Sequence, residues 1–307
     1  MSPIKIAIVG VGKIARDQHI PVIAASPDFT LVCAASRNAT VDGVQNFTNI
    51  DDMLTAFPDI QAVALCTPPQ DRHLYARSAL TQGKHVLLEK PPGATLSEIE
   101  EIAALAERHR RTLFATWHSR FAPAVEPARA WLSTRTIKSV SVAWKEDVRH
   151  WHPGQEWIWQ PGGLGVFDPG INALSIMTRI LPHPFFLKSG TLSFPENRYT
   201  PIAADLSFTD SRGIDIRAEF DWRQTGPQTW DIDVSTDDGT LSLQKGGSVL
   251  SINGVAHPCP PEAEYRGVYD RFAQLIAAEK SDIDIAPLRH VADAFLLGRH
   301  ERVASFV

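Results

Sequence analysis

The sequence predicts an α/β protein, in which an N-terminal, doubly wound parallel sheet precedes an α+β domain with a large, mainly antiparallel open sheet. In the first part of the chain, short apolar runs alternate with helical segments, as is typical of a parallel sheet. A Gly10-x-Gly12-x-x-Ala15 motif follows the first apolar run. Later alternating runs are separated by hairpin signals such as Asp238-Gly239 and Asn253-Gly254. We therefore expect two domains, residues 1–122 and residues 123–307.

The first domain is expected to contain five buried strands and the helices that connect them. The strands are predicted at residues 4–9, 29–35, 62–66, 85–88 and 113–116. Helices are predicted up to residue 25 and at residues 51–57, 71–82 and 97–110. Gly83 is expected to end the third helix, because glycine readily adopts the left-handed conformation of a C-cap. Ser97 and Glu100 have the spacing of a capping box at the start of the fourth helix.

The second domain is expected to combine helices with the open sheet. Helices are predicted at residues 124–132, 172–181, 265–278 and 287–298, and the C-terminal helix could pack back on the first domain. Residues 139–144 alternate as a half-buried strand. An antiparallel sheet left bare on one face would expose apolar surface, and pairing of two such faces is the usual remedy. We therefore expect a homodimer or a higher homo-oligomer through this sheet.

The composition is that of an ordinary globular protein and argues against several classes of partner. The 307 residues are 44% hydrophobic and carry a formal net charge of -5, which gives no electrostatic reason to bind nucleic acid or an anionic membrane. Cys33, Cys66 and Cys259 lack metal-ligand spacing, so no metal is expected. No stretch approaches the ~20 apolar residues of a membrane span. Because the N-terminal apolar run is too short for a signal peptide, we expect a cytoplasmic protein.

The glycine motif predicts a dinucleotide site at the end of the first strand. Gly10 permits a tight turn, and Gly12 lets the backbone approach a pyrophosphate at the start of the following helix. Lys13 and Ile14 lie in the same loop and are expected to contact the cofactor. The alternative is a plain glycine turn, which the order of strand, motif and helix disfavours.

The ends of the second and third strands carry residues that bear on the choice of cofactor. Ser36-Arg37 stands where NAD enzymes place an acidic residue for the ribose hydroxyls. Because a guanidinium can bind a 2′-phosphate through charge-assisted hydrogen bonds, we expect NADP to be preferred, with NAD use possible. The alternative is a solvated arginine and a preference for NAD. Thr67 and Pro68 are expected to shape the wall near the nicotinamide ribose, or only to end the third strand.

Glu89-Lys90-Pro91-Pro92 follows the fourth strand directly. A lysine at the C-terminal end of a buried parallel strand points into the crevice where such sheets bind ligands. The prolines end the strand and fix the backbone beyond it. We expect Glu89 and Lys90 to contact the cofactor and Lys90 to contact the substrate as well. A strand-end lysine in solvent is the alternative.

These motifs resemble the glucose–fructose oxidoreductase, inositol dehydrogenase and rhizopine-catabolism (Gfo/Idh/MocA) family. The matching segments are the N-terminal glycine motif, Cys66-Thr67-Pro68-Pro69, Glu89-Lys90-Pro91 and Gly165-Val166-Phe167-Asp168-x-x-x-Asn172. They occur in the family's order, and the resemblance covers the whole chain. Residues 114–120, 144–149 and 151–155 are similar to its aldose 1-dehydrogenase branch, which comprises L-arabinose and D-galactose 1-dehydrogenases. Asn172 stands where the family usually has histidine. An asparagine at this position is similar to the aldose 1-dehydrogenase branch.

The resemblance implies a Rossmann cofactor domain and the NAD(P)-dependent oxidation of an aldopyranose at C1 to its lactone. L-Arabinose is the expected substrate, together with D-galactose. The resemblance also implies that Lys90, Asp168 and Asn172 carry the chemistry. The nicotinamide accepts the hydride, and a base must accept the proton of the anomeric hydroxyl. We favour Asp168 as the base, with Lys90 and Asn172 orienting the sugar; Lys90 as the base is the alternative.

From the residues alone, Asp168 would simply be the N-cap of a helix whose first position is Pro169. Asn172 would then lie on the same helix face one turn later.

A pyranose needs polar side chains for its hydroxyls and aromatic planes for its C–H faces. The residues expected to line the sugar pocket are Lys90, His118, Glu146, Trp151, His152, Asp168 and Asn172. Glu146 and Asp147 would point to opposite faces of a strand, so at most one should contact the sugar. Another sugar or polyol oxidoreductase, and a non-catalytic NADP-binding regulatory protein, are the competing interpretations.

Overall fold

The computed structural model describes residues 2–307, and these residues divide into two compact units. The first unit contains the chain up to His118 together with Tyr265–Ile285. The second unit contains Ser119–Glu264 and Ala286–Val307. The division thus differs from the expected one at residue 122, and one late segment groups with the first unit. No helix within residues 2–307 is both long enough and apolar enough to cross a membrane.

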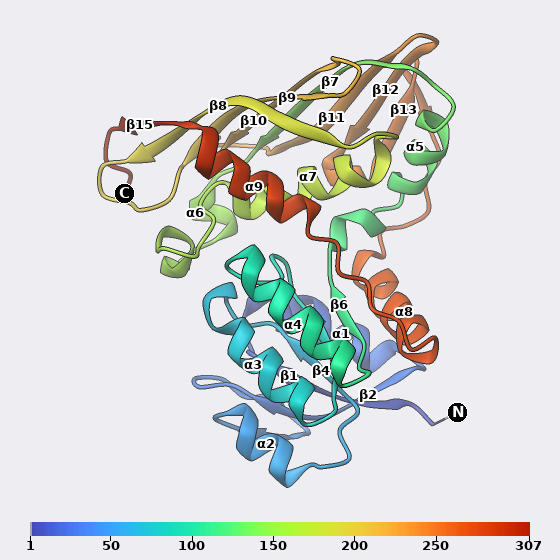
Figure 1. The fold of residues 1–307 in the computed structure, drawn as a ribbon, viewed down its shortest axis with the longest axis vertical. Helices are drawn as coiled ribbons and strands as arrows, with labels where there is room; N and C mark the ends of the chain where they lie inside the picture. The colour runs from blue at the N-terminus through green and yellow to red at the C-terminus, as the bar shows by residue number, and fades with distance from the viewer. Residues whose placement is uncertain (1) are drawn as a thin grey trace. The chain divides into compact units, whose positions relative to one another are not determined.

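A six-stranded parallel sheet in the order β3-β2-β1-β4-β5-β6 forms the centre of the first unit (Figure 1). Its strands are β1 (Ile4–Val9), β2 (Phe29–Ala35), β3 (Gln45–Phe47), β4 (Ala62–Leu65), β5 (His85–Leu88) and β6 (Leu113–Ala115). The strand order reverses between β1 and β4, which is where such sheets bind ligands. The five predicted strands are confirmed, but β3 was missed because this short edge strand is mostly polar.

The helices of the first unit begin and end close to the predicted positions. They are the π-helical turn η1 (Ala15–His19), α1 (Ile20–Ala25), α2 (Ile50–Ala56), α3 (Pro69–Thr81), α4 (Leu96–Arg108) and the late α8 (Glu264–Ala277). Gly83 follows α3 with φ 75°, as predicted. The capping box of α4 is formed by Thr95 and Glu98, so the prediction of Ser97 and Glu100 was wrong. Thr95 has the extended backbone of an N-cap, whereas Ser97 already lies within the helix.

The second unit contains a nine-stranded sheet in the order β14-β13-β12-β11-β7-β10-β9-β8-β15. Its strands are β7 (Ile137–Lys145), β8 (Phe185–Pro195), β9 (Ala203–Asp210), β10 (Asp215–Asp221), β11 (Thr229–Thr236), β12 (Gly239–Gln244), β13 (Val249–Ile252), β14 (Val255–His257) and β15 (Arg299–Val303). Strand β7 pairs in parallel with β10, and β15 with β8, while the other neighbouring strands are antiparallel. The mainly antiparallel sheet is therefore confirmed, although it is no simple meander.

Helices α7 (Phe167–Ile180) and α9 (Ala286–Leu297) lie along one face of this sheet (Figure 1). The remaining helical segments of the unit are η2 (His118–Phe121), α5 (Val125–Leu132), α6 (Val148–Trp151), η3 (Glu156–Trp159) and η4 (Lys245–Gly247). The close approach of α7 depends on Gly170, because a Cβ there would lie 2.7 Å from the ring of Phe220 on β10.

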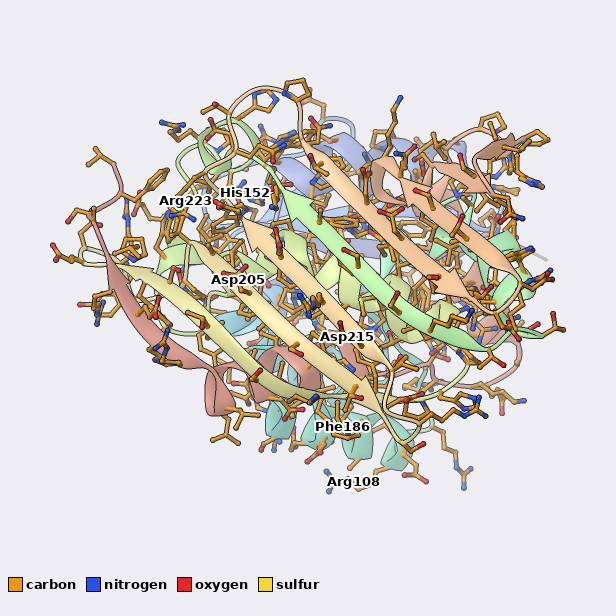
Figure 2. The ribbon with its side chains drawn as sticks, turned by 90° about the horizontal axis from the view of Figure 1, so that it is seen from above. Arg108, His152, Phe186, Asp205, Asp215 and Arg223 are labelled. Carbon is orange, nitrogen blue, oxygen red and sulfur yellow. The ribbon has the colours of Figure 1, made fainter. Side chains whose placement is uncertain are left out.

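The opposite face of the nine-stranded sheet is polar, which contradicts the expectation that it exposes apolar surface. Figure 2 looks onto this face and labels Asp205 on β9 and Asp215 on β10. Along β10 the outward residues are Asp215, Arg217 and Glu219, while the residues between them are buried. Glu219 lies opposite Asp205 in the β9–β10 register, and burial together with Glu219 raises the pKa of Asp205. Apolar exposure therefore gives no argument for pairing of two sheets, and the homo-oligomer stays a prediction.

Candidate functional site

A cavity of about 260 Å³ lies at the C-terminal ends of β1, β2 and β4 in the first unit. Six of the residues predicted to bind the cofactor line it: Gly10, Gly12, Ser36, Arg37, Thr67 and Pro68. Lys13 and Ile14 are not among its lining residues, and the Lys13 ammonium forms an ion pair with Asp17 instead. The place of the cavity in the sheet is that of a dinucleotide site.

The two glycines of the motif meet different requirements. Gly10 has φ 91°, and a Cβ on it would lie 2.8 Å from the backbone nitrogen of Thr67. Only glycine fits this turn, because both its backbone conformation and the neighbouring strand exclude a side chain. By contrast, nothing lies within 4 Å of the position that a Cβ on Gly12 would take. The open space in front of Gly12, on the cavity wall, fits the close approach of a pyrophosphate.

Arg37 lies at the rim of the cavity, with its side chain 74% exposed. Its guanidinium is 3.8 Å from the carboxylate of Asp71 on α3. An exposed pair at this distance is weak, so the guanidinium is available to a phosphate at the rim. The sequence does not predict the other lining residues, which are Val9, Val11, Ala35, Asn38, Ala39, Thr48, Asn49, Ile50, Cys66 and Tyr75. Asn38 directly follows Arg37 and could have been found, but Thr48 and Tyr75 are brought to the cavity only by the fold.

Glu89 is turned into the interior of the first unit and does not line the cavity. Its carboxylate is 3.0 Å from His19 Nε2 and accepts hydrogen bonds from the Tyr265 hydroxyl at 2.8 Å and from the Lys90 backbone at 2.9 Å. Burial opposes ionisation of Glu89, but His19, His118 and Tyr265 together outweigh it and lower the pKa to about 2. Glu89 is therefore an ionised anchor for the strand end, and its predicted contact with the cofactor has no support from this placement.

The anchor extends from Glu89 to residues of η1 and α8. His19 is fully buried, with Nδ1 2.7 Å from the hydroxyl of Tyr269. Burial lowers the pKa of His19, but Cys66, Tyr269 and Glu89 favour the imidazolium and raise it well above its usual value. The ring of Tyr265 stacks on His118, with centroids 5.3 Å apart. The predicted sugar residue His118 is thereby held against the same network.

In the second unit, Glu146 is the centre of an aromatic cluster. The carboxylate is buried and accepts hydrogen bonds from the indole nitrogens of Trp222, at 3.2 Å, and Trp230, at 2.8 Å. His152 Nε2 lies 3.6 Å from a carboxylate oxygen of Glu146 and 3.6 Å from one of Asp168. Trp151 packs on Trp230, with ring centroids 5.0 Å apart. The structure therefore brings together four predicted residues: Glu146, Trp151, His152 and Asp168.

Glu146 and Asp147 lie beyond the last residue of β7, Lys145, so strand alternation does not apply to them, and their carboxylates have different partners. The Asp147 carboxylate accepts the Arg149 amide at 2.9 Å as the N-cap of α6, and it also pairs with the Arg149 guanidinium. Trp222 was not identified from the sequence, because a buried tryptophan just beyond a strand is indistinguishable from an ordinary core residue.

Asp168 lies inside α7 and does not cap it, so its prediction as an N-cap was wrong. The cap is Val166, and the Asp168 amide donates to the Gly165 carbonyl at 2.8 Å. A tight turn forms this entry to the helix, since Gly165 has φ 55° and a Cβ there would lie 2.4 Å from the Pro201 carbonyl oxygen. Asp168 is buried and Asn172 half-buried one turn later. The helix thus presents both predicted residues at its N-terminal end.

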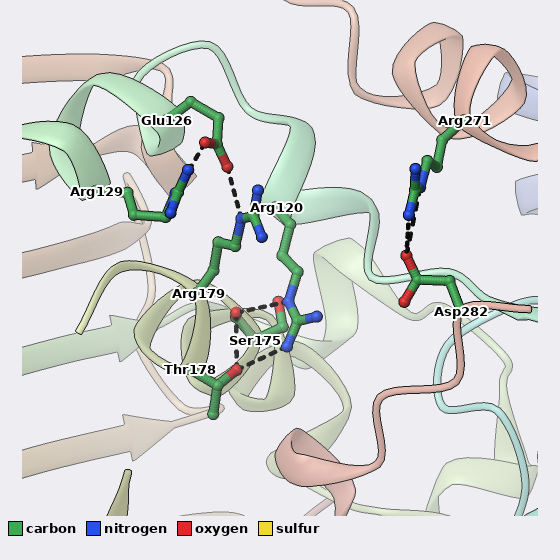
Figure 3. A network of polar contacts seen from close by, with 8 residues as sticks. All are labelled: Arg120, Glu126, Arg129, Ser175, Thr178, Arg179, Arg271 and Asp282. Carbon is green, nitrogen blue, oxygen red and sulfur yellow. Dashed lines mark hydrogen bonds and ion pairs between the residues drawn. The ribbon is translucent and has the colours of Figure 1, made fainter. Parts of the chain in front are cut away.

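The C-terminal half of α7 is fixed by polar contacts (Figure 3). Arg120 donates to the Ser175 carbonyl at 2.9 Å and to the Thr178 hydroxyl at 2.8 Å. Arg179 pairs with Glu126 of α5 at 2.6 Å. These contacts hold the C-terminal half of α7, and Gly170 packs against Phe220 of β10. Together they fix the position of the helix and therefore of the residues at its N-terminal end.

Comparison with known proteins gives consistent results. Residues 4–116 match the model of an oxidoreductase family with an NAD-binding Rossmann fold. The chain is 49% identical to galactose 1-dehydrogenase of Pseudomonas fluorescens over 306 residues, covering 100% of this chain and 99% of that one. The structure is similar to the crystal structure of D-galactose-1-dehydrogenase from Rhizobium etli, with a TM-score of 0.96 and 60% identity over 100% of this chain and 99% of that one.

A more distant structural relative shows the breadth of the fold. A 3-ketoreductase from Actinomadura kijaniata, solved with NADP, has a TM-score of 0.85 and 18% identity over 98% of this chain and 99% of its own. At that identity the likeness concerns the fold alone.

Proposed function

Because the chain belongs to the Gfo/Idh/MocA oxidoreductase family, we propose that it oxidises an aldopyranose, D-galactose or L-arabinose, at C1 to the lactone with NADP as the preferred hydride acceptor. The observation that carries the proposal is the position of His152, 3.6 Å from the buried carboxylates of Glu146 and Asp168 and beside Trp151 and Trp230. Carboxylates, an imidazole and indole faces are the groups that recognise a pyranose.

The reaction divides between the nicotinamide and the side chains of the protein. When bound, the cofactor supplies the hydride acceptor. We assign to Asp168 the proton of the anomeric hydroxyl, and to Lys90 and Asn172 the orientation of that hydroxyl and of the ring oxygen. The Lys90 ammonium would then stabilise the developing negative charge on the anomeric oxygen. Glu146, His118 and His152 would bind the remaining hydroxyls.

The test is to follow nicotinamide reduction with a panel of aldoses. Reduction of NADP with D-galactose or L-arabinose, and accumulation of the lactone, are the expected results. D-Galactose and L-arabinose differ only in the substituent at C5, so discrimination between them should be worth about 1–3 kcal/mol. Tight NADP binding without turnover of any aldose would overturn the enzymatic assignment and favour a regulatory protein.

Arg37 is predicted to set the preference for NADP. In the Arg37→Ala variant, the Kd for NADP should rise by about ten-fold to a hundred-fold, because a charge-assisted contact to the 2′-phosphate is lost, while the Kd for NAD should change little. Asp71→Asn is the matched control: it removes the charge of the carboxylate that pairs with Arg37 and should not weaken NADP binding. An unchanged ratio of the two Kd values in Arg37→Ala would show that another group selects the cofactor.

Glu146 is predicted to bind a sugar hydroxyl. Glu146→Gln should raise KM for the sugar by about ten-fold to a hundred-fold, the value of a hydrogen bond to a charged group, and leave the Kd for NADP unchanged. The neighbouring Asp147→Asn provides the control, because that carboxylate caps α6. Equal effects of the two substitutions on KM would contradict the assignment.

A further inference from the structure

The guanidinium of Arg72, on α3, is enclosed by backbone carbonyls at two strand ends. The residue is 2% exposed, and buried charges persist only where polar groups surround them. Its Nη1 donates to the carbonyl oxygens of both Glu89 and Pro91. Its Nη2 donates to the carbonyl oxygen of Thr67. One side chain therefore binds three carbonyls that lie beyond the last residues of β4 and β5, Leu65 and Leu88.

These three carbonyls have a particular position in the chain. Glu89 and Pro91 are the neighbours of Lys90 on either side, and Thr67 is part of the cavity wall. The sheet itself no longer holds this segment beyond the bond from the Glu89 amide to the Leu65 carbonyl. The hydrogen bonds from Arg72 therefore hold the backbone where the hydrogen bonds of the sheet have ended.

We propose that Arg72 is a positioning residue. It fixes the backbone on both sides of Lys90 and holds that segment in a defined position relative to Thr67 in the cavity wall. Where it concerns turnover, this inference rests on the proposed function. The planar guanidinium presents five donors in a rigid fork and can hold three carbonyls in one geometry. A lysine at the same place would keep the charge but lose the fork.

The expected consequence is a loss of turnover without a matching loss of cofactor affinity. A displacement of about 1 Å in a catalytic group can cost about a hundred-fold in rate. The pyrophosphate end of the cavity, at Gly10 and Gly12, is built by β1 and the loop that follows it, whereas the hydrogen bonds of Arg72 go to the carbonyls of Thr67, Glu89 and Pro91.

The experiment compares Arg72→Lys and Arg72→Gln with Arg77→Lys and Arg77→Gln. Arg77 lies on the same helix, but its side chain is 54% exposed and pairs with Glu101. Each variant is examined for kcat with D-galactose, for the Kd of NADP, and for amide hydrogen exchange in a peptide spanning residues 86–95. A peptide spanning residues 239–252, in β12 and β13 of the second unit, serves as the internal reference.

In Arg72→Lys we expect kcat to fall by at least about ten-fold, the Kd for NADP to stay within about three-fold, and exchange to accelerate in residues 86–95 only. The Arg77 variants should match the wild type in all three. Unchanged exchange in residues 86–95, or a kcat loss matched by an equal loss of NADP affinity, would overturn the proposal. If Arg72→Gln does not fold, Arg72→Lys decides. If the wild type oxidises no aldose, the proposed function fails, while the exchange data still decide the role of Arg72.

Discussion

Asp168→Asn is expected to lower kcat by about 10²–10⁴-fold, the range that a positioned general base contributes. The substitution keeps the size and shape of a buried side chain. It also leaves the hydrogen bond from the Asp168 backbone amide to the Gly165 carbonyl unaffected. The Kd for NADP should therefore remain that of the wild type. Turnover of the aldose, measured by nicotinamide reduction at saturating sugar, is the measurement.

Lys90→Met separates the two candidate bases. As a cation that stabilises the anomeric oxyanion, Lys90 should contribute about 10²–10³-fold to kcat. The discriminating measurement is the pH profile of kcat, because removing the general base abolishes the ionisation that limits the rate at low pH, whereas removing the cation leaves it. Near-normal turnover in Asp168→Asn, together with its loss in Lys90→Met, would exchange the roles. Asn172→Ala is the companion variant, with a smaller expected loss because its amide only orients the sugar.

The cofactor half of the site could be predicted because its determinants are local. Gly10 and Gly12 follow one strand directly, and the turn they form depends only on that strand and the next helix. Arg37 and Thr67 are also found by counting to the ends of strands. What could not be predicted is the partner of each strand-end residue, such as the side chain of Arg72.

The sugar half required the fold. Glu146 is 76 residues from Trp222 and 84 from Trp230, and these residues meet because β7 pairs with both β10 and β11. Hydrophobic alternation indicates each strand but does not reveal which strands are neighbours. The polarity of the open sheet face was not predicted for a related reason. Its serine and acidic residues alternate along the strands with the buried residues, and they can be assigned to one face only when the pairing of the strands is known.

Glu89→Gln is expected to be the most destabilising of the proposed substitutions. Its carboxylate has a pKa of about 2 in the folded protein against 4.5 as the usual value, so at neutral pH its ionised contacts contribute about 3 kcal/mol to the free energy of unfolding. The variant also leaves the buried His19 without its carboxylate partner. An uncompensated charge in the protein interior is destabilising, so the free energy of unfolding should fall further. Urea unfolding of the wild type and the variant measures the difference.

The pH dependence gives the sign of the effect. Between the folded and unfolded pKa values of Glu89 the unfolded chain binds more protons, so stability rises with pH in that window. The contribution of Glu89 is complete above about pH 4.5 and is lost as the pH falls towards about 2. His19 has the opposite sign: its pKa is raised, so its contribution is complete below 6.5 and is lost as the pH rises through the raised value.

The difference between wild type and Glu89→Gln should therefore be largest near neutral pH and shrink as the solution is acidified. Glu101→Gln is the matched control, because that carboxylate is more exposed and pairs with Arg77 and His73 at the surface, where such pairs contribute about 1 kcal/mol or less. A double-mutant cycle with His19→Gln isolates the coupling between His19 and Glu89. A coupling energy near zero, or a stability difference that persists unchanged into acid, would mean that Glu89 is held by burial and packing and not by its charge.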